Sequence, residues 1–265
     1  MSTLSTTPLL GTQGERPLEG IIFDVDGTLA DTEELHRQAF NASFRAFGLA
    51  WEWTPPRYQE LLAISGGRER MAHYAAALAL GGAPVTLTPQ IIAEIHRDKT
   101  ARYGQLLRAG SLALRPGAAR LIQEARAAGV RLAIATSSAR SNLETLLNLN
   151  LAPDWPQWFA AIETCDSVPA KKPAPAVYQA ALANAGLSAT HCVAIEDTTN
   201  GLQAALAAGL RTVITTHRYT RCEAFPGASL VVDGLGDPAQ PPRVQAGDLY
   251  GQTCVNLALL RCLVR

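Results

Sequence analysis

The chain has 265 residues, of which 48% are hydrophobic and 17% are charged, so it can form a sizeable buried core and is not expected to be disordered. Its 23 Lys and Arg residues balance its 23 Asp and Glu residues, which removes the electrostatic reason to expect a nucleic-acid or membrane-surface partner. All apolar runs fall short of the roughly 20 residues that a membrane span needs.

The first segment, residues 1–19, is rich in Ser, Thr, Gly and Pro, and we expect it to be a flexible leader. A short apolar run follows at residues 20–23 and leads directly into an aspartate. Similar runs at residues 130–135, 192–195 and 210–214 each end in two polar residues. Short runs that are apolar throughout are typical of strands buried on both faces of a parallel sheet.

Helical patterns lie between these runs. They cover residues 118–128, 174–184 and 201–208, and a glycine directly follows the first and the last of them. Glycine after the last helical residue is an expected helix end. The alternation of strands and helices predicts an α/β fold with a doubly wound, Rossmann-like parallel sheet.

One connection, from residue 32 to residue 113, is too long for an ordinary strand-to-helix loop. It holds helical patterns at residues 33–47, 56–63, 68–80 and 89–108, which indicates an inserted α-helical domain. The predicted domains are a core over 20–32 and 113–235, the helical insertion over 33–112, and a C-terminal linker and tail over 236–265. The pattern at 250–265 fits a short helix or a short strand, and the choice stays open.

Five scattered cysteines without a CxxC motif indicate reduced thiols and argue against a disulfide framework or a zinc site. The first twenty residues lack the basic start and apolar stretch of a secretory signal. We therefore expect a cytoplasmic protein.

Polar side chains gather where the predicted strands end. Asp24 and Asp26 follow the first strand, Thr136 follows the second, and Glu196 and Asp197 follow the third. Ligands of open parallel sheets bind at this edge. Converging carboxylates repel one another unless they share a cation, and oxygen-only ligands suit Mg²⁺. The sequence therefore predicts a Mg²⁺ site that also receives a phosphate.

These residue types fit phosphoryl transfer. Asp24 can attack phosphorus and form an aspartyl-phosphate, and Asp26 can protonate the leaving oxygen and then activate water. Asp24 would be ionised and Asp26 able to hold a proton. Thr136 can bind the phosphoryl oxygens and Lys172 can offset their charge. Taken singly, these residues could also be turn residues, helix caps or solvated loop residues, but their combination in this order favours the catalytic interpretation.

The strings FDVDGT (23–28), AT (135–136), KKP (171–173) and AIEDT (194–198) resemble the four motifs of the haloacid dehalogenase superfamily. The resemblance covers about residues 20 to 235 and implies Mg²⁺-dependent chemistry through an aspartyl-phosphate. It implies that Asp24 is the nucleophile and a Mg²⁺ ligand. It further implies that Asp26 is the acid/base and binds Mg²⁺ through its backbone carbonyl, and that Asp197, with Glu196 beside it, completes the metal site.

The insertion is similar to the cap of the β-phosphoglucomutase-like branch. Within it, DVDGTLADTEELHRQAF (24–40), WEW (51–53), GGRER (66–70), IHRDKT (95–100), RPG (115–117) and KKPAPAVY (171–178) most resemble the CbbY-type xylulose-1,5-bisphosphate phosphatases, which are linked to carbon fixation. The resemblance implies a phosphorylated sugar as the partner molecule. This chain departs from those relatives at two positions. Arg68 stands where they often carry Lys, and Ala176 stands where they often carry Asp.

A sugar bisphosphate has a second phosphate, which cations on a closing cap could bind. The cap segment GGRER begins a helix with backbone donors and arginines, and the segment HRDKT adds further cations, His96 among them. The cap charges could also simply solvate helix faces. The predicted substrate-binding residues are Asp24, Glu33, His36, Gly66, Gly67, Arg68, Glu69, Arg70, His96, Arg97, Lys99, Thr136, Ser137, Ser138, Asn142 and Lys172.

The prediction is a Mg²⁺-dependent sugar-bisphosphate phosphatase that converts xylulose 1,5-bisphosphate to xylulose 5-phosphate. A phosphosugar mutase would share every core residue, because the phosphoryl group can pass to a sugar hydroxyl. A phosphatase for a small monophosphate such as phosphoglycolate would not need the second phosphate site. The presence of both Asp24 and Asp26 argues against a non-catalytic sugar-phosphate sensor. Protein partners and the oligomeric state are not predicted.

Overall fold

The computed structural model describes residues 18–81, 87–110 and 112–264. Most of the predicted leader, residues 1–17, therefore lies outside the described residues. Leu18 is buried, and Glu19 is hydrogen-bonded through its backbone, so these two residues belong to the folded part.

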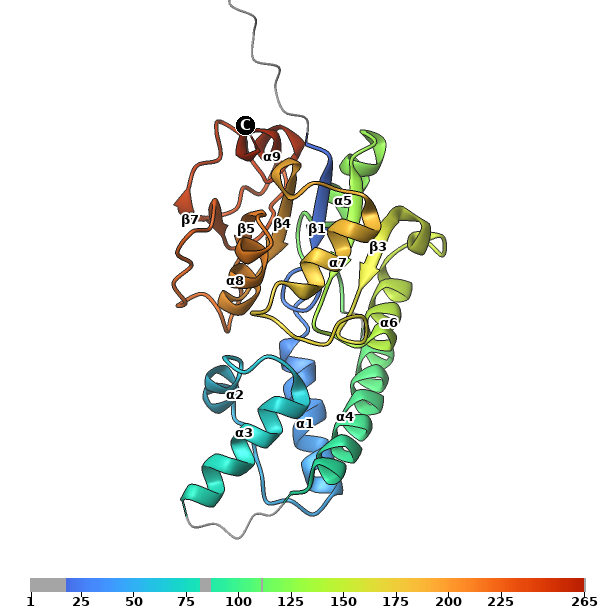
Figure 1. The fold of residues 1–265 in the computed structure, drawn as a ribbon, viewed down its shortest axis with the longest axis vertical. Coiled ribbons are helices and arrows are strands. Elements are labelled where there is room, and N and C mark those ends of the chain that lie inside the picture. The colour runs from blue at the N-terminus through green and yellow to red at the C-terminus, as the bar shows by residue number, and fades with distance from the viewer. Residues whose placement is uncertain (1–17, 82–86, 111, 265) are drawn as a thin grey trace, which may run out of the picture.

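A seven-stranded sheet forms the centre of the molecule, with the strand order β3-β2-β1-β4-β5-β6-β7 (Figure 1). Every neighbouring pair is parallel except β6 and β7, which are antiparallel. The central strands β1 and β4 are buried along their whole length, as their apolar sequences predict. The strands are β1 (Gly20–Phe23), β2 (Arg131–Ala135), β3 (Phe159–Glu163), β4 (Cys192–Glu196), β5 (Arg211–Thr215), β6 (Leu230–Val232) and β7 (Val244–Gly247).

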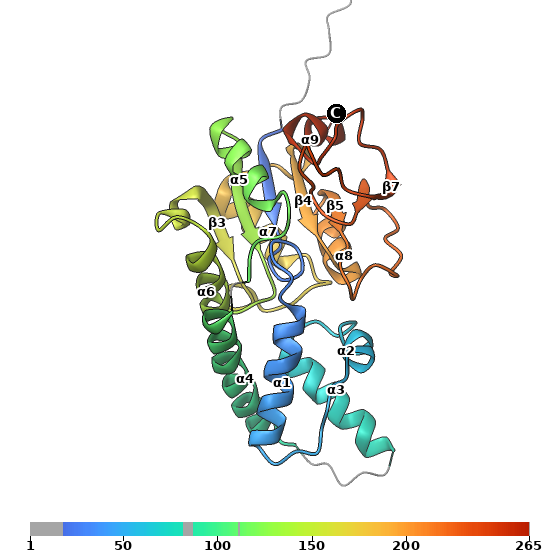
Figure 2. The same cartoon turned by 180° about the vertical axis from the view of Figure 1, so that it is seen from behind.

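Helices cover both faces of this sheet (Figure 2), which confirms the predicted doubly wound α/β class. One apolar cluster joins one face of the sheet to α5, α6 and α9, and a second joins the other face to α7 and α8. The helices are α5 (Ala118–Ala127), α6 (Arg140–Asn150), α7 (Ala176–Ala185), α8 (Thr199–Ala207) and α9 (Leu257–Leu263), with short 3-10 turns at Trp155–Trp158 and Ala189–His191.

The segment between β1 and α5 forms a separate group of helices beyond the carboxyl ends of the central strands (Figure 1). We call residues 33–109 the helical part. It comprises α1 (Glu33–Ala46), α2 (Pro55–Leu61), α3 (Gly67–Leu80) and α4 (Pro89–Ala109). Its own apolar cluster contains Phe40, Trp51, Trp53 and Tyr58. Since Trp51 and Trp53 are buried there, they stabilise the helical part.

The prediction of a linker and tail after residue 235 is wrong. Residues 244–247 form β7 at the sheet edge, and α9 buries Leu257, Leu260 and Leu263 in the main core. Of the two alternatives left open at residues 250–265, the short helix is the one that forms, as α9; at seven residues it is too short for a helical period to decide the choice. The strand β7 was missed because all four of its residues are exposed, so it carries no apolar pattern.

Among the described residues, no helix combines the length and the apolar character that crossing a bilayer requires.

Candidate active site

The predicted catalytic residues meet at the carboxyl ends of the three central strands. Because β1 lies between β2 and β4, the loops that follow these strands bring together Asp24, Thr136 and Asp197. Lys172 reaches the same place from the loop before α7. The helical part closes the opposite side, so the cavity lies between the sheet and the helical part.

Lys172 is the buried cation of the site. Its Nζ donates to Asp24 Oδ1 at 2.6 Å and to the Ala135 carbonyl at 3.0 Å, and it also contacts Glu196 Oε1. Burial would lower the pKa of Lys172, but the carboxylates of Asp24 and Glu196 outweigh burial and raise it. Lys172 is therefore charged at neutral pH and balances one of its two carboxylate partners.

Asp24, Glu196 and Asp197 each place a carboxylate oxygen within 4.8 Å of the others, and all three are buried. Burial, together with the neighbouring carboxylates, raises the pKa of Asp24 and the pKa of Asp197. Three acids around one lysine leave uncompensated negative charge, which a divalent cation would neutralise. The donor set consists of oxygen atoms alone, and it fits Mg²⁺.

Glu196 differs from the two aspartates in its surroundings. Its Oε1 accepts from Tyr178 Oη at 2.8 Å, and its Oε2 accepts from the backbone N–H of Asp197 at 3.0 Å. Burial would raise the pKa of Glu196, but Lys172 and these hydrogen bonds lower it. Asp24 and Asp197 line the cavity, whereas Glu196 lies fully buried behind them. Glu196 thus chiefly holds Lys172 in place.

Asp26 begins a chain of three side chains that runs into the helical part. Its Oδ1 contacts Thr32 Oγ1 at 2.7 Å and His36 Nε2 at 3.0 Å, and Lys99 Nζ lies 2.6 Å from His36 Nδ1. An ammonium group can only donate, so Nδ1 accepts and Nε2 carries the proton that His36 donates to Asp26. Burial and the nearby Lys99 lower the pKa of His36, which agrees with a neutral ring.

The surroundings of Asp26 in the structure stabilise its carboxylate form. Burial would raise the pKa of Asp26, but His36 and the hydroxyls of Thr32 and Ser138 stabilise the carboxylate and lower it. Without substrate this lowered pKa favours the ionised form of Asp26, whereas the expected role as the acid needs the protonated form. The negative charge of an incoming phosphate would raise the pKa of Asp26 again.

The expected charge of His96 differs as well, because the sequence analysis counted this residue among the cations. Burial, followed by the neighbouring Lys99, Arg68 and Lys171, lowers the pKa of His96 to about 3. A neutral imidazole can still bind a phosphate or a hydroxyl as a hydrogen-bond donor.

Most of the predicted residues line one cavity. It contains the predicted residues Asp24, Asp26, Glu33, His36, Gly66, Gly67, Arg70, His96, Lys99, Thr136, Ser137, Ser138, Asn142, Lys172 and Asp197. The predicted residues Arg68, Glu69 and Arg97 line a neighbouring groove between α3, α4 and α6, which shares His96 and Asn142 with the cavity.

Two residues of the GGRER segment face the protein itself. The Arg70 guanidinium donates to the carbonyls of Leu61 and Ile64 and to Tyr58 Oη. Glu69 accepts from Lys171 Nζ at 2.7 Å through both oxygens. Gly66 has a φ of +92°, and a Cβ there would lie 2.2 Å from Glu69 Oε2, so only glycine allows this contact between the helical part and the sheet part.

Several residues of the site were missed from the sequence. Tyr58 donates to Glu33 Oε2 at 2.7 Å, and Asn200 donates to the Ala63 carbonyl at 2.9 Å. His217 contacts Asp197 behind the cavity. The sequence did carry a signal for two of them, because Asn200 and His217 follow the ends of predicted strands, where site residues gather. Tyr58 carried no signal, because it fits the pattern of a helix core.

Comparison with known proteins matches the chain to a family of hydrolases. Residues 18–209 match the family model of the haloacid dehalogenase-like hydrolases. The chain is 49% identical over 224 residues to the plasmid-encoded protein CbbY of Cupriavidus necator, which covers 84% of this chain and 88% of that protein. It is 44% identical over 220 residues to protein CbbY of Cereibacter sphaeroides, covering 83% of this chain and 94% of that protein.

A solved structure shows the same fold. The crystal structure of CbbY from Rhodobacter sphaeroides in complex with xylulose-(1,5)bisphosphate superposes with a TM-score of 0.78 at 43% sequence identity. The match covers 83% of this chain and 96% of that one. The similarity therefore includes both the sheet and the helical part.

Proposed function

The chain belongs to the haloacid dehalogenase-like hydrolases, and from this premise we propose that it is a Mg²⁺-dependent phosphatase of a sugar bisphosphate. The preferred substrate in this proposal is xylulose 1,5-bisphosphate, which would yield xylulose 5-phosphate and inorganic phosphate. The observation that carries the proposal is the convergence of Asp24, Lys172 and Asp197 at one cavity.

The proposal includes a cytoplasmic location. The five cysteines are free thiols, which agrees with a reducing compartment.

Asp24 would act as the nucleophile. Lys172 binds Asp24 Oδ1, which leaves Oδ2 to attack phosphorus; the P–O bond to the sugar breaks and an aspartyl-phosphate forms. Mg²⁺ would be held by Asp24, Asp197 and the Asp26 backbone carbonyl, with Glu196 within reach, and when bound it would neutralise charge on the phosphoryl group. Thr136 and Lys172 would bind the remaining phosphoryl oxygens.

Asp26 would move the protons. It would protonate the leaving sugar oxygen in the first half of the reaction, after the phosphate has raised its pKa. In the second half it would take a proton from the water that hydrolyses the aspartyl-phosphate. The hydrogen bonds from Thr32 and His36 hold the Asp26 carboxylate and favour this second, basic role.

The helical part would select the substrate. Glu33 lies in the cavity and is oriented by Tyr58, so it could accept hydrogen bonds from sugar hydroxyls. The neighbouring groove holds Arg68, Arg97 and Lys171, and these cations could bind a second phosphate. The complex of the similar CbbY with xylulose-(1,5)bisphosphate supports the choice of a bisphosphate.

The test is a phosphate-release screen with purified protein, with and without Mg²⁺. Substrates would be xylulose 1,5-bisphosphate, other sugar bisphosphates, sugar monophosphates and phosphoglycolate. We expect the highest kcat/KM for xylulose 1,5-bisphosphate and no turnover without the metal. Isomerised sugar phosphate without phosphate release would instead show a mutase, and equal activity on phosphoglycolate would show that no second phosphate is recognised.

A further inference from the structure

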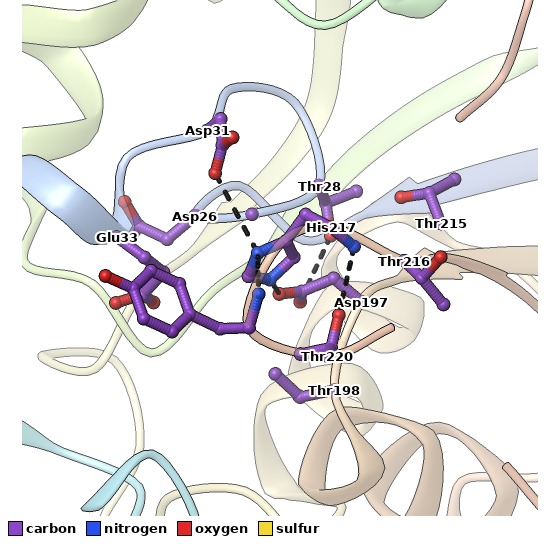
Figure 3. A network of polar contacts seen from close by, with 12 residues as sticks. Asp26, Thr28, Asp31, Glu33, Asp197, Thr198, Thr215, Thr216, His217 and Thr220 are labelled. Atoms are coloured by element: carbon purple, nitrogen blue, oxygen red, sulfur yellow. Dashed lines mark hydrogen bonds and ion pairs between the residues drawn. The ribbon is translucent and has the colours of Figure 1, made fainter. Parts of the chain in front are cut away.

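His217 lies directly behind the proposed metal site. It follows β5, whereas Asp197 follows β4, and His217 Nε2 is 2.9 Å from Asp197 Oδ2 (Figure 3). Both side chains are buried, with exposed fractions of 3% and 2%. A histidine in this place has no role in the phosphoryl transfer described above, so its contact with Asp197 needs its own explanation.

The loop after His217 determines which ring nitrogen carries the proton. The backbone N–H of Tyr219 lies 3.4 Å from Nδ1. An amide N–H can only donate, so Nδ1 accepts, and the Asp197 carboxylate beside Nε2 favours the proton there. The Asp31 carboxylate also faces Nδ1, but its Oδ1 is 3.8 Å away, beyond hydrogen-bond distance. A neutral His217 therefore donates a hydrogen bond to Asp197 Oδ2.

The same loop fixes the position of the ring. The His217 backbone N–H donates to Thr220 Oγ1 at 3.1 Å, and the His217 carbonyl accepts from the backbone N–H groups of Thr220 and Arg221 at 3.1 and 2.9 Å. These bonds close a tight turn around His217, and Figure 3 shows Thr220 beside it. The ring is thus held by the backbone and not only by its contact with Asp197.

Gly27 makes room for the pair. It has a φ of +81°, and a Cβ there would lie 2.1 Å from Asp197 Oδ2 and 2.9 Å from His217 Nε2. On the other carboxylate oxygen, Thr28 Oγ1 lies 3.4 Å from Asp197 Oδ1. Each carboxylate oxygen has two lone pairs, so Asp197 can accept these hydrogen bonds and still bind a cation.

We propose that His217 is a positioning residue that orients the Asp197 carboxylate for Mg²⁺ and thereby sets the metal affinity of the site. This inference rests on the proposed function, because it takes Asp197 as a metal ligand. Residues that hydrogen-bond to metal ligands typically contribute 10- to 100-fold to metal affinity. His217 touches neither the substrate nor the reacting atoms in this scheme, so its effect would appear in metal binding before it appears in chemistry.

The experiment compares His217→Met with His217→Gln, two side chains of similar size that differ in having an N–H donor. Titration calorimetry without substrate would give the Mg²⁺ dissociation constant of each variant, of the wild type and of Cys222→Ala, a control at an exposed position of the same loop. We expect about tenfold or greater weakening in His217→Met, a change below threefold in His217→Gln, and none in Cys222→Ala. At saturating Mg²⁺, kcat of His217→Met should approach the wild-type value.

Two failures can be told apart. If the wild type and Asp197→Asn bind Mg²⁺ equally or not at all, the proposed metal site is wrong. If Asp197→Asn loses Mg²⁺ while His217→Met binds it as tightly as the wild type, the role of His217 is overturned. Equal weakening in His217→Met and His217→Gln would also overturn it. Thermal unfolding of the metal-free variants checks the fold, and His217→Leu replaces His217→Met if the latter does not fold.

Discussion

Lys172 Nζ lies 2.6 Å from Asp24 Oδ1, and this buried contact joins two positions 148 residues apart in the chain. The nucleophile position and its cation therefore come together only when β1 and the loop before α7 are both in place. The contact keeps Asp24 in one orientation and compensates part of the negative charge at the site.

Asp24→Asn removes the proposed nucleophile while keeping the shape of the side chain. We expect kcat to fall by about 10⁴-fold or more with the fold intact, as judged by circular dichroism. Asp248→Asn makes the same chemical change at an exposed position and should leave kcat unchanged. Near-normal phosphate release by Asp24→Asn would rule out the aspartyl-phosphate mechanism.

Lys172→Met leaves the buried carboxylates without their ammonium partner. In metal-free buffer the free energy of unfolding should fall by about 3–5 kcal/mol, and added Mg²⁺ should restore part of it by replacing the lost charge. Lys171→Met, the same change one residue earlier, breaks only a partly exposed pair with Glu69, with a cost below about 1 kcal/mol. Denaturant titration measures the free energy of unfolding of both variants. Equal losses in Lys172→Met and Lys171→Met would contradict the assignment of Lys172 as the buried cation of the site.

Activity should fall above about pH 8. Burial lowers the pKa of Lys99 to about 8, so below this pH the charged ammonium donates to His36 Nδ1 and keeps the Nε2 proton directed at Asp26. Above this pH the Lys99 ammonium loses its proton, and the direction of the hydrogen bonds between Lys99, His36 and Asp26 is no longer fixed. We expect kcat/KM, which reports the free enzyme, to follow a single-proton curve with its midpoint near pH 8. Lys99→Met should lower kcat/KM at pH 7 and remove this midpoint; an unchanged profile would exclude Lys99 as its source.

The ion pair of Glu69 and Lys171 joins the helical part to the sheet part, and we expect it to contribute to substrate binding. Their bond is partly exposed, so Glu69→Gln should raise KM by about two- to fivefold, as expected for an ion pair worth up to about 1 kcal/mol. A double-mutant cycle with Lys171→Met should be non-additive. If Glu69 instead contacts the substrate, its effect would be undiminished in the Lys171→Met background.

Arg68→Ala tests recognition of the second phosphate. Loss of a charged hydrogen bond should raise KM for xylulose 1,5-bisphosphate by about tenfold or more and leave KM for a sugar monophosphate nearly unchanged. Arg45→Ala, on α1, is the control. Equal effects on both substrates would place Arg68 outside the phosphate site.

The strands that carry the catalytic acids could be predicted from the sequence because they are apolar along their whole length. β1 and β4 are buried throughout, and Asp24 and Asp197 follow from the places where these runs end. β3 (FAAIE), a parallel strand at the sheet edge, was missed; its apolar run resembles those of β1 and β4, but its second residue is exposed and its fourth is partly exposed. Burial on both faces gives a strong signal, and an edge strand gives a weak one.

The contacts between side chains could not be predicted in the same way. The chain from Asp26 through His36 to Lys99 exists because α1 and α4 pack side by side, and no local pattern encodes that packing. The ionisation states depend on it as well. His96 has neighbouring cations and partial burial, and together these make neutral a residue that composition alone presents as a candidate charge.

The packing of α9 on α5 also affects how the polypeptide is made. Leu257, Leu260 and Leu263 belong to the same buried apolar cluster as Leu121 and Ile122 of α5, and the two helices contact each other. Until the ribosome has translated past this segment, the nascent chain leaves that face of the sheet domain exposed to water. We therefore expect nascent chains stalled before residue 257 to bind chaperones and to be cleaved readily by proteases.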